Sequence, residues 1–253
     1  MHITSWNVNS LNVRLPHVLQ YLHETAPDIL GLQELKQTDA AVDTTAIEAA
    51  GYHIATHGQK TYNGVALIAR EPLTDVVRGI PGYADEQARA IAASIGDVRV
   101  LNLYVPNGKA VGDEKYTYKL HWLDAATRYI DELKREHPRL IITGDYNIAP
   151  ADLDVHDPDK WRDQILCSAP ERQALQNILA LGFKDAYRAL HPDTQQFSWW
   201  DYRMGGLRRN IGLRIDLTLA SDALTLDAAG IDTAPRHWER PSDHAPAWVK
   251  IGT

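Results

Sequence analysis

Apolar runs typical of buried strands alternate with stretches of helical spacing along the whole chain, and this alternation limits the fold more than any other feature. The runs are rich in β-branched residues and occur at 2–8, 28–33, 64–69, 90–95, 98–105, 139–143, 214–220 and 246–251. Runs of this length and composition predict strands. Strands interleaved with helices from end to end predict an α/β fold.

The helical stretches are recognised by their spacing. The clearest is 116–136, where one face holds an apolar residue every three or four positions. These residues are Leu123, Ala126, Ile130 and Leu133. A second helix is expected to begin near Pro16, and a third to cover 171–181, because Gly182 follows it as a helix-ending glycine would.

The segments 104–115 and 144–170 predict long loops. Both are polar and rich in Pro, Gly and Asp, and both come directly after a predicted strand. Loops in this position often carry function. The junctions of strand and loop are therefore the first places to look for a functional site.

Neither a Gly/Ser-rich linker nor a repeat of fixed period divides the 253 residues, so we expect one domain over 1–253. Cys167 is the single cysteine, which excludes an internal disulfide and a zinc site built on several thiolates. No apolar run approaches the roughly 20 residues of a membrane span, and the N-terminus lacks the pattern of a signal peptide. We expect a cytoplasmic protein without a membrane partner.

Polar side chains stand at the ends of predicted strands. Asp145 and Asn147 follow the run 139–143, and in extended chain their spacing of two predicts side chains that point the same way. A carboxylate beside an amide suits phosphate hydrolysis, because the acid takes a proton from water while the amide donates to an oxygen. Taken alone, the pattern is equally that of a strand ending in a turn, since Gly, Asp and Asn are turn residues.

The same pattern recurs at two other strand ends. Asn7 and Asn9 end the first run, although asparagine is a poor strand residue, and Gln33 and Glu34 end the second. Together the ends offer hard oxygen ligands without thiolates, which suits Mg²⁺ or Mn²⁺. Capping explains each strand end singly but explains the combination poorly.

A histidine in the proline-bounded segment 240–246 is a further candidate. Ser242, Asp243 and His244 are not a serine-hydrolase triad, because neighbouring side chains point in different directions and triad residues meet through the fold. An acid inside an apolar run upstream, Asp216, is the better partner for His244 and would orient and protonate the imidazole. Asp243 is then free for a metal ion. The simpler alternative is a surface histidine in a turn.

The formal charge is −7, from 26 Lys and Arg against 33 Asp and Glu, which excludes a uniformly basic nucleic-acid coat. The segment 202–214 is a local exception, with four arginines, no acid, and glycines for flexibility. It suits a phosphate backbone, and the aromatic residues in 197–202 offer faces for a base or sugar. Such aromatic residues are more often core and such arginines are often just solvated, but their juxtaposition favours binding.

Several blocks of sequence closely resemble the exodeoxyribonuclease III family of apurinic/apyrimidinic endonucleases. They follow the family's order and are WNVNSL (6–11), LQELK (32–36), YNGVALIAR (62–70), LYVPNG (103–108), GDYNIAPADLDV (144–155), FSWWDYR (197–203), GLRIDLTLAS (212–221) and RPSDHAPAW (240–248). The resemblance implies a four-layer α/β sandwich, two facing β-sheets flanked by helices. It also implies Mg²⁺-dependent hydrolysis of DNA phosphodiesters at abasic sites and 3′ ends, with Mn²⁺ as a substitute.

The resemblance also assigns roles to residues. The implied catalytic residues are Tyr104, Asp145, Asn147, Asp216 and His244, and those at the metal are Asn7, Glu34, Asp145, Asn147 and Asp243. The implied DNA-binding residues are Trp199, Arg203, Arg208, Arg209, Leu213 and Ile215. Two residues depart from the family. Ser10 stands where the family usually has glycine, and its side chain changes how closely the first loop approaches DNA. Leu213 stands where some relatives carry tryptophan, which changes how tightly the abasic-sugar pocket fits.

We therefore expect a monomeric DNA-repair phosphodiesterase acting on double-stranded DNA with abasic sites or blocked 3′ ends. One alternative is a phosphatase of the same fold that acts on lipid or inositol phosphates; the arginine-rich segment and the lack of an apolar membrane-facing segment argue against it. Another is a DNA-binding protein that has lost catalysis. Every matched acid, amide and imidazole is present, which argues against that loss.

Overall fold

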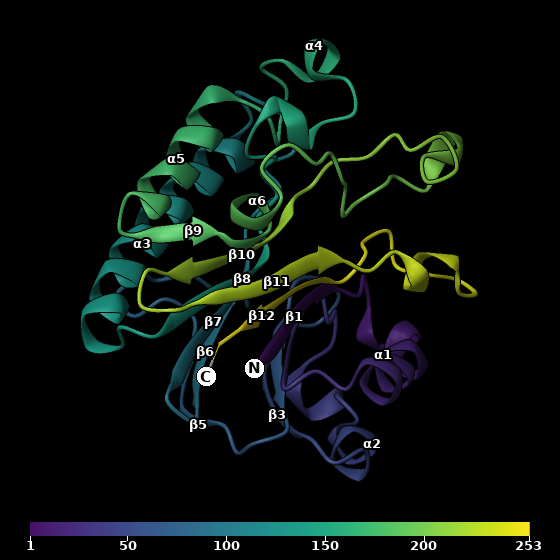
Figure 1. Ribbon diagram of the computed structural model, residues 1–253, viewed down its shortest axis with the longest axis vertical. Helices are drawn as coiled ribbons and strands as arrows, with labels where there is room; N and C mark the ends of the chain where they lie inside the picture. Colours follow the sequence, from purple (N-terminus) through teal and green to yellow (C-terminus); the bar gives the residue numbers. More distant parts are fainter. Residues whose placement is uncertain (253) are drawn as a thin grey trace.

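The computed structural model describes residues 1–252, and of Met204 the backbone alone. Two six-stranded sheets form its centre (Figure 1). The first sheet contains, in spatial order, β11 (Leu226–Ile231), β12 (Ala247–Ile251), β1 (His2–Asn7), β2 (Ile29–Gln33), β4 (Val65–Ala69) and β3 (His53–His57). The second contains β5 (Thr74–Arg78), β6 (Ala90–Ile95), β7 (Val98–Tyr104), β8 (Leu140–Asp145), β10 (Asp216–Ser221) and β9 (Phe183–Asp185).

All the strands predicted from apolar runs are present, and the strands that were missed are β3, β5, β9 and β11. These four are the two edges of each sheet. Edge strands are half exposed and short or polar; β5, for example, has no fully buried residue. The apolar pattern reports burial, so it detects central strands and misses strands at an edge.

The long helices largely confirm the predictions, with shifts at their ends. Helix α3 (Glu114–Glu136) starts where the Asp113 side chain accepts from the Lys115 amide, and α5 (Ala169–Leu179) starts at a capping box of Ser168 and Glu171. Helix α1 (Leu11–Thr25) begins before Pro16, so the expected start was wrong. The segment 144–170 is not simply a loop, since it contains a 3₁₀ turn and a short helix. The remaining helices are α2 (Thr44–Ala49), α4 (Pro158–Trp161) and α6 (Ala186–Leu190).

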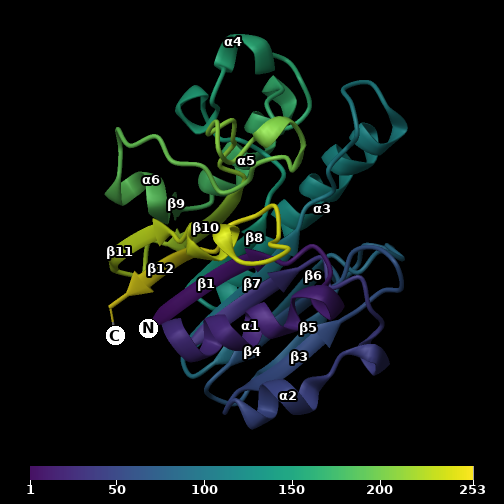
Figure 2. The same cartoon turned by 90° about the vertical axis from the view of Figure 1, so that its right-hand side faces the viewer.

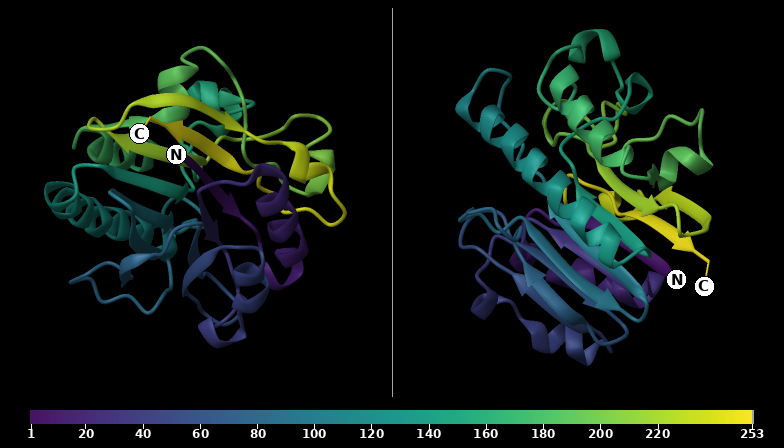
Figure 3. Two further views of the ribbon diagram at one scale, coloured as in Figure 1. Left: turned by 60° about the horizontal axis from the view of Figure 1, so that its bottom comes forward. Right: turned by 90° about the vertical axis from the view of Figure 1, so that its left-hand side faces the viewer.

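The layers are held together by separate apolar clusters. One cluster lies between the sheets and includes Ile3 and Val65 from the first sheet and Val100 and Ile141 from the second. Helices α1 and α2 cover the outer face of the first sheet (Figure 2), while α3 and α5 cover the second (Figure 3). The four-layer α/β sandwich is therefore confirmed. None of the helices in residues 1–252 is long and apolar enough to cross a membrane.

Candidate active site

Three predicted residues from three strand ends meet directly. Asn7 ends β1, Glu34 follows β2, and Asp145 ends β8 in the opposite sheet. The Asn7 Nδ2 atom donates to Glu34 Oε1 and to Asp145 Oδ2, both at 2.9 Å. The carboxyl ends of the parallel pair β1 and β2 thus face the carboxyl end of β8, which brings the two sheets together at one polar cluster.

The backbone turns sharply at each strand end. Asn9, Glu34 and Asn147 have φ values of 45°, 55° and 48°, in the left-handed region. The amides of Asn9 and Asn147 donate to the side-chain oxygens of Asn7 and Asp145, both at 2.9 Å. The premise of extended chain at these pairs was therefore wrong, and a turn holds Asn9 beside Asn7 and Asn147 beside Asp145. Such strained residues persist where their surroundings fix them, and they cluster at functional sites.

Asn9 extends the cluster toward Asp243. Its Nδ2 donates to Asp243 Oδ1 at 3.0 Å, and its Oδ1 accepts from Lys36 Nζ at 2.6 Å. The same ammonium lies 3.0 Å from Glu34 Oε2. Lys36 was not predicted as a site residue, and its place two residues after Glu34 was the only available signal.

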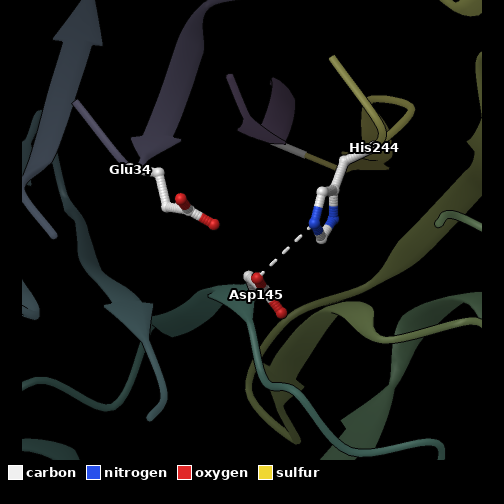
Figure 4. A group of neighbouring side chains, drawn as sticks. All are labelled: Glu34, Asp145 and His244. Carbon is white, nitrogen blue, oxygen red and sulfur yellow. Dashed lines mark ion pairs between the residues drawn. The ribbon is translucent and has the colours of Figure 1, made fainter. Parts of the chain in front are cut away.

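His244 and Asp216 form the predicted pair. His244 Nδ1 lies 2.9 and 3.1 Å from the two Asp216 oxygens, and its Nε2 faces Asp145 Oδ2 at 3.8 Å. Figure 4 shows Glu34, Asp145 and His244 pointing toward one another. The Ser242 hydroxyl donates to the Asn7 carbonyl instead of to His244, which agrees with the rejection of a serine triad.

The electrostatics of this buried group favour a charged imidazole. Burial lowers the pKa of His244, but Asp216 and Asp145 outweigh it and raise that pKa to about 10. Burial raises the pKa of Asp145 to about 7, even though His244 opposes the rise. Burial and the charges of Glu34 and Asp145 also raise the pKa of Tyr104 well above its usual value, so its phenol remains a proton donor. The Arg89 guanidinium lies over the Tyr104 ring, 4.8 Å from its centre.

The cluster fits a divalent cation. Glu34, Asp145 and His244 each offer a ligand atom, and these atoms lie within 4.8 Å of one another. Asp216 pairs with His244, and Lys36 lies beside Glu34, so the carboxylates of the cluster already have cationic neighbours within the chain. Hard carboxylate and amide oxygens are the ligands that Mg²⁺ and Mn²⁺ prefer. Because a protonated imidazole cannot bind a metal, the carboxylates are the stronger candidates.

Comparison with known proteins decides the family. The sequence profile of the Endonuclease/Exonuclease/phosphatase family matches residues 4–244. The chain belongs to this family. It is similar to exodeoxyribonuclease III of Haemophilus influenzae, with 37% identity over 99% of this chain and 100% of the relative.

Solved structures of the family have the same fold. A Neisseria 3′ phosphatase, NExo, bound to a product DNA hairpin matches with a TM-score of 0.99 and 45% identity over 100% of both chains. An AP endonuclease from Archaeoglobus fulgidus matches with a TM-score of 0.97 and 36% identity, again over 100% of both chains. The resemblance inferred from the sequence is thereby confirmed.

In this family member a pocket of about 1270 Å³ adjoins the cluster and includes four of the predicted DNA-binding residues, Trp199, Arg203, Arg209 and Leu213. Trp199 also links the pocket to the cluster, because its Nε1 donates to Asp243 Oδ2 at 3.0 Å. Ile215 packs in the apolar group behind Leu213.

The start of β10 explains why the adjacent residues Ile215 and Asp216 have different neighbours: Ile215 packs among apolar side chains, and Asp216 contacts His244. The strand begins only at Asp216, and both amides donate to the buried Ser198 hydroxyl oxygen at 3.0 Å. The backbone therefore curves around one oxygen at this point, which directs the Asp216 carboxylate to His244.

The arginine-rich segment differs from its prediction. Arg203, Arg208 and Arg209 are all exposed, and Arg203 also pairs with Asp201 at 2.5 Å. Arg214 is only 1% exposed and pairs with Asp154 and Asp185, both at 2.7 Å. The four arginines therefore do not form one basic surface, because Arg214 neutralises acids of the interior.

The aromatic residues and glycines around this segment also serve packing. Phe197 and Trp200 are 2% and 3% exposed and belong to the core between the sheets, so they do not offer faces for bases. A Cβ atom on Gly212 would lie 2.6 Å from the Trp200 ring nitrogen, and one on Gly206 would lie 2.5 Å from the Asp201 carbonyl. These two glycines allow close approach of the neighbouring chain, which gives them a packing role that was not predicted.

Proposed function

We infer that this chain is a Mg²⁺-dependent DNA-repair phosphodiesterase that incises 5′ to abasic sites and processes 3′ ends as an exonuclease and phosphatase, with Mn²⁺ able to substitute. The observation that carries this proposal is the cluster of half-buried Glu34 with buried Asp145 and His244, and the pocket beside it. The names of the relatives support it, since they include an exodeoxyribonuclease III, a 3′ phosphatase bound to DNA and an AP endonuclease. We also propose that the protein is a monomer, that it is cytoplasmic and that residues 1–253 form one domain.

Glu34 and Asp145 would hold the metal ion, with Asn7, Asn147 and Asp243 near it. When bound, the ion would withdraw charge from the phosphoryl oxygens and acidify a water molecule. The ion's charge would also lower the pKa of Asp145, which keeps that carboxylate ready to accept a proton. The chain's carboxylates thus act as metal ligands and as a base.

Asp145 takes the proton from the attacking water as the water oxygen bonds to phosphorus. The bond between phosphorus and the 3′ oxygen breaks, and the leaving 3′ oxygen takes a proton from solvent. His244, held by Asp216, presents its Nε2 proton toward Asp145 and stabilises the charge that develops on a phosphoryl oxygen. Tyr104 donates to the same phosphate, and Asn147 has one amide hydrogen left after donating to the Val105 carbonyl at 3.0 Å. These donors are held in place before substrate binds.

The test compares an abasic duplex, a duplex with a 3′-phosphate, an undamaged blunt duplex and a phosphoinositide, each with Mg²⁺ and with a chelator. We expect metal-dependent cleavage of the abasic duplex and the 3′-phosphate, and no reaction with the phosphoinositide. Rates on DNA that are unchanged by the chelator would refute the metal assignment. Hydrolysis of the phosphoinositide alone would replace the proposal with the lipid-phosphatase alternative.

A further inference from the structure

Lys119 is a fully buried cation that no part of the proposed mechanism uses. It lies on α3 with a side chain that is 0% exposed, as is that of its partner Glu171. Its Nζ donates to the Asn147 carbonyl at 2.6 Å, the Asn107 carbonyl at 3.2 Å and Glu171 Oε1 at 2.5 Å. An ammonium group has three hydrogens, so all three are directed at fixed oxygens around the active site.

The two carbonyl groups belong to residues that contact each other beside Asp145. Asn107 Nδ2 donates to Asn147 Oδ1 at 3.1 Å, and the Asn147 amide donates to Asp145 Oδ1. Asn147 has a left-handed backbone, which asparagine adopts more readily than most residues, and these hydrogen bonds fix the orientation of that turn. Lys119, on α3, donates to the backbone carbonyl of Asn147 and so holds this residue from its other side.

The cation is itself held by the first turn of α5. The two Glu171 oxygens accept from the Leu166 amide at 3.1 Å and from the Ser168 amide and hydroxyl at 3.1 and 2.6 Å. Gly108 leaves room for the lysine, because a Cβ there would lie 3.1 Å from Lys119 Cδ. A rigid connection therefore runs from α5 through Glu171 and Lys119 to Asn147.

A buried ion pair such as Lys119 and Glu171 contributes little net free energy to the stability of a fold. Removing two charges from water is costly, and apolar replacement of such a pair is often neutral or stabilising. The lysine is needed at this position only if the two carbonyl groups must be held, since a methionine would fill the same space.

We propose that Lys119 is a positioning residue for DNA hydrolysis, which fixes Asn147 so that its free amide hydrogen meets the reacting phosphate. The proposal rests on the proposed function. Displacement of a reacting group by about 1 Å costs about 100-fold in rate. Loss of Lys119 should therefore reduce kcat and leave KM for DNA nearly unchanged.

The experiment uses the full chain and the 3′-phosphate duplex. Lys119→Met with Glu171→Gln replaces the pair together, so that no buried carboxylate is left without its cation. We expect a folded protein with a lower Tm, because the Asn107 and Asn147 carbonyl groups lose their donor. Below that Tm, kcat should be reduced about 100-fold and KM should stay within about threefold. The control is Lys134→Met, which removes another α3 lysine that donates to the Leu181 and Gly182 carbonyl groups, and it should keep wild-type kcat.

Coupling to Asn147 supplies the second readout. Asn147→Ala alone should lower kcat about as much as the paired variant does. Adding Asn147→Ala to the paired variant should then cost less than about threefold more, because both changes remove the same interaction. A paired variant with wild-type kcat, an equal loss in the Lys134 variant, or a full additional loss from Asn147→Ala would overturn the proposal. Wild-type protein that does not cleave DNA would instead overturn the proposed function.

Discussion

Trp199 combines two interactions that substitution can separate. Its indole Nε1 donates to Asp243 Oδ2 at 3.0 Å, and its ring lines the pocket beside the cluster. Trp199→Phe removes the hydrogen bond but keeps an aromatic wall. Trp199→Ala removes both. The two variants therefore distinguish orientation of Asp243 from selection of the sugar that enters the pocket.

The expected loss of rate is estimated separately for the hydrogen bond between Trp199 and Asp243 and for the indole ring. A hydrogen bond to a charged group contributes about 1.5–3 kcal/mol, and Trp199 and Asp243 are both partly exposed, so the lower value of about 1.5 kcal/mol applies. That is about tenfold in rate on every substrate. Loss of the ring removes apolar contacts worth about 1–3 kcal/mol, or about 5- to 150-fold, but only for a sugar extruded into the pocket.

The assay measures kcat/KM for abasic incision and for 3′-phosphate removal, whose terminal position needs less extrusion. Trp199→Phe should lower both values about tenfold and leave their ratio unchanged. Trp199→Ala should shift the ratio at least about fivefold against abasic incision. The ratio cancels any loss of folded protein. Equal losses on both substrates in Trp199→Ala would mean that Trp199 is general packing and that abasic selectivity lies elsewhere.

Other substitutions test separate parts of the site. Glu34→Gln should raise the Mg²⁺ concentration for half-maximal rate, because an amide is a weaker ligand for a hard cation; an unchanged Mg²⁺ titration would point to other ligands. Replacing Arg208 and Arg209 together with alanine should lower the slope of log Kd against log salt concentration by up to ~2. Arg203→Ala should change this slope less, because Arg203 is already paired with Asp201. Slopes equal to that of the wild type in all variants would mean that the three arginines do not contact DNA phosphates. Ser198→Ala leaves two buried amides without an acceptor and should lower the free energy of unfolding by about 2–6 kcal/mol in urea titrations; a wild-type midpoint would contradict the role given to its hydroxyl.

The central strands and the long helices were predictable because burial leaves an apolar pattern in the sequence. The edge strands were not, since β9 spans only Phe183–Asp185 and β5 is largely exposed. The start of α1 was hidden by Pro16, which usually marks the first turn of a helix but here lies inside one. The arrangement of two facing sheets came from the resemblance, because periodicity alone does not distinguish it from a doubly wound sheet.

The acids and the imidazole of the site were predictable from their places at strand ends, but their contacts were not. Asn147 sits where the chain turns, and a spacing rule for extended chain cannot describe it. Arg214 looked like its neighbours in the arginine-rich segment, yet its acidic partners are about 30 and 60 residues away in sequence. Lys119 lies within an amphipathic helix, where a lysine normally indicates a solvated face.

The most direct test of the account is single-turnover cleavage of the abasic duplex by Asp145→Asn, measured together with DNA binding. Asn keeps the shape of the side chain but cannot take a proton from water. We expect wild-type or tighter binding, because a negative charge is removed, and a cleavage rate about 10²–10⁴-fold lower. Cleavage near the wild-type rate with Mg²⁺ present would contradict the assignment of Asp145 as the base and of this cluster as the hydrolytic centre.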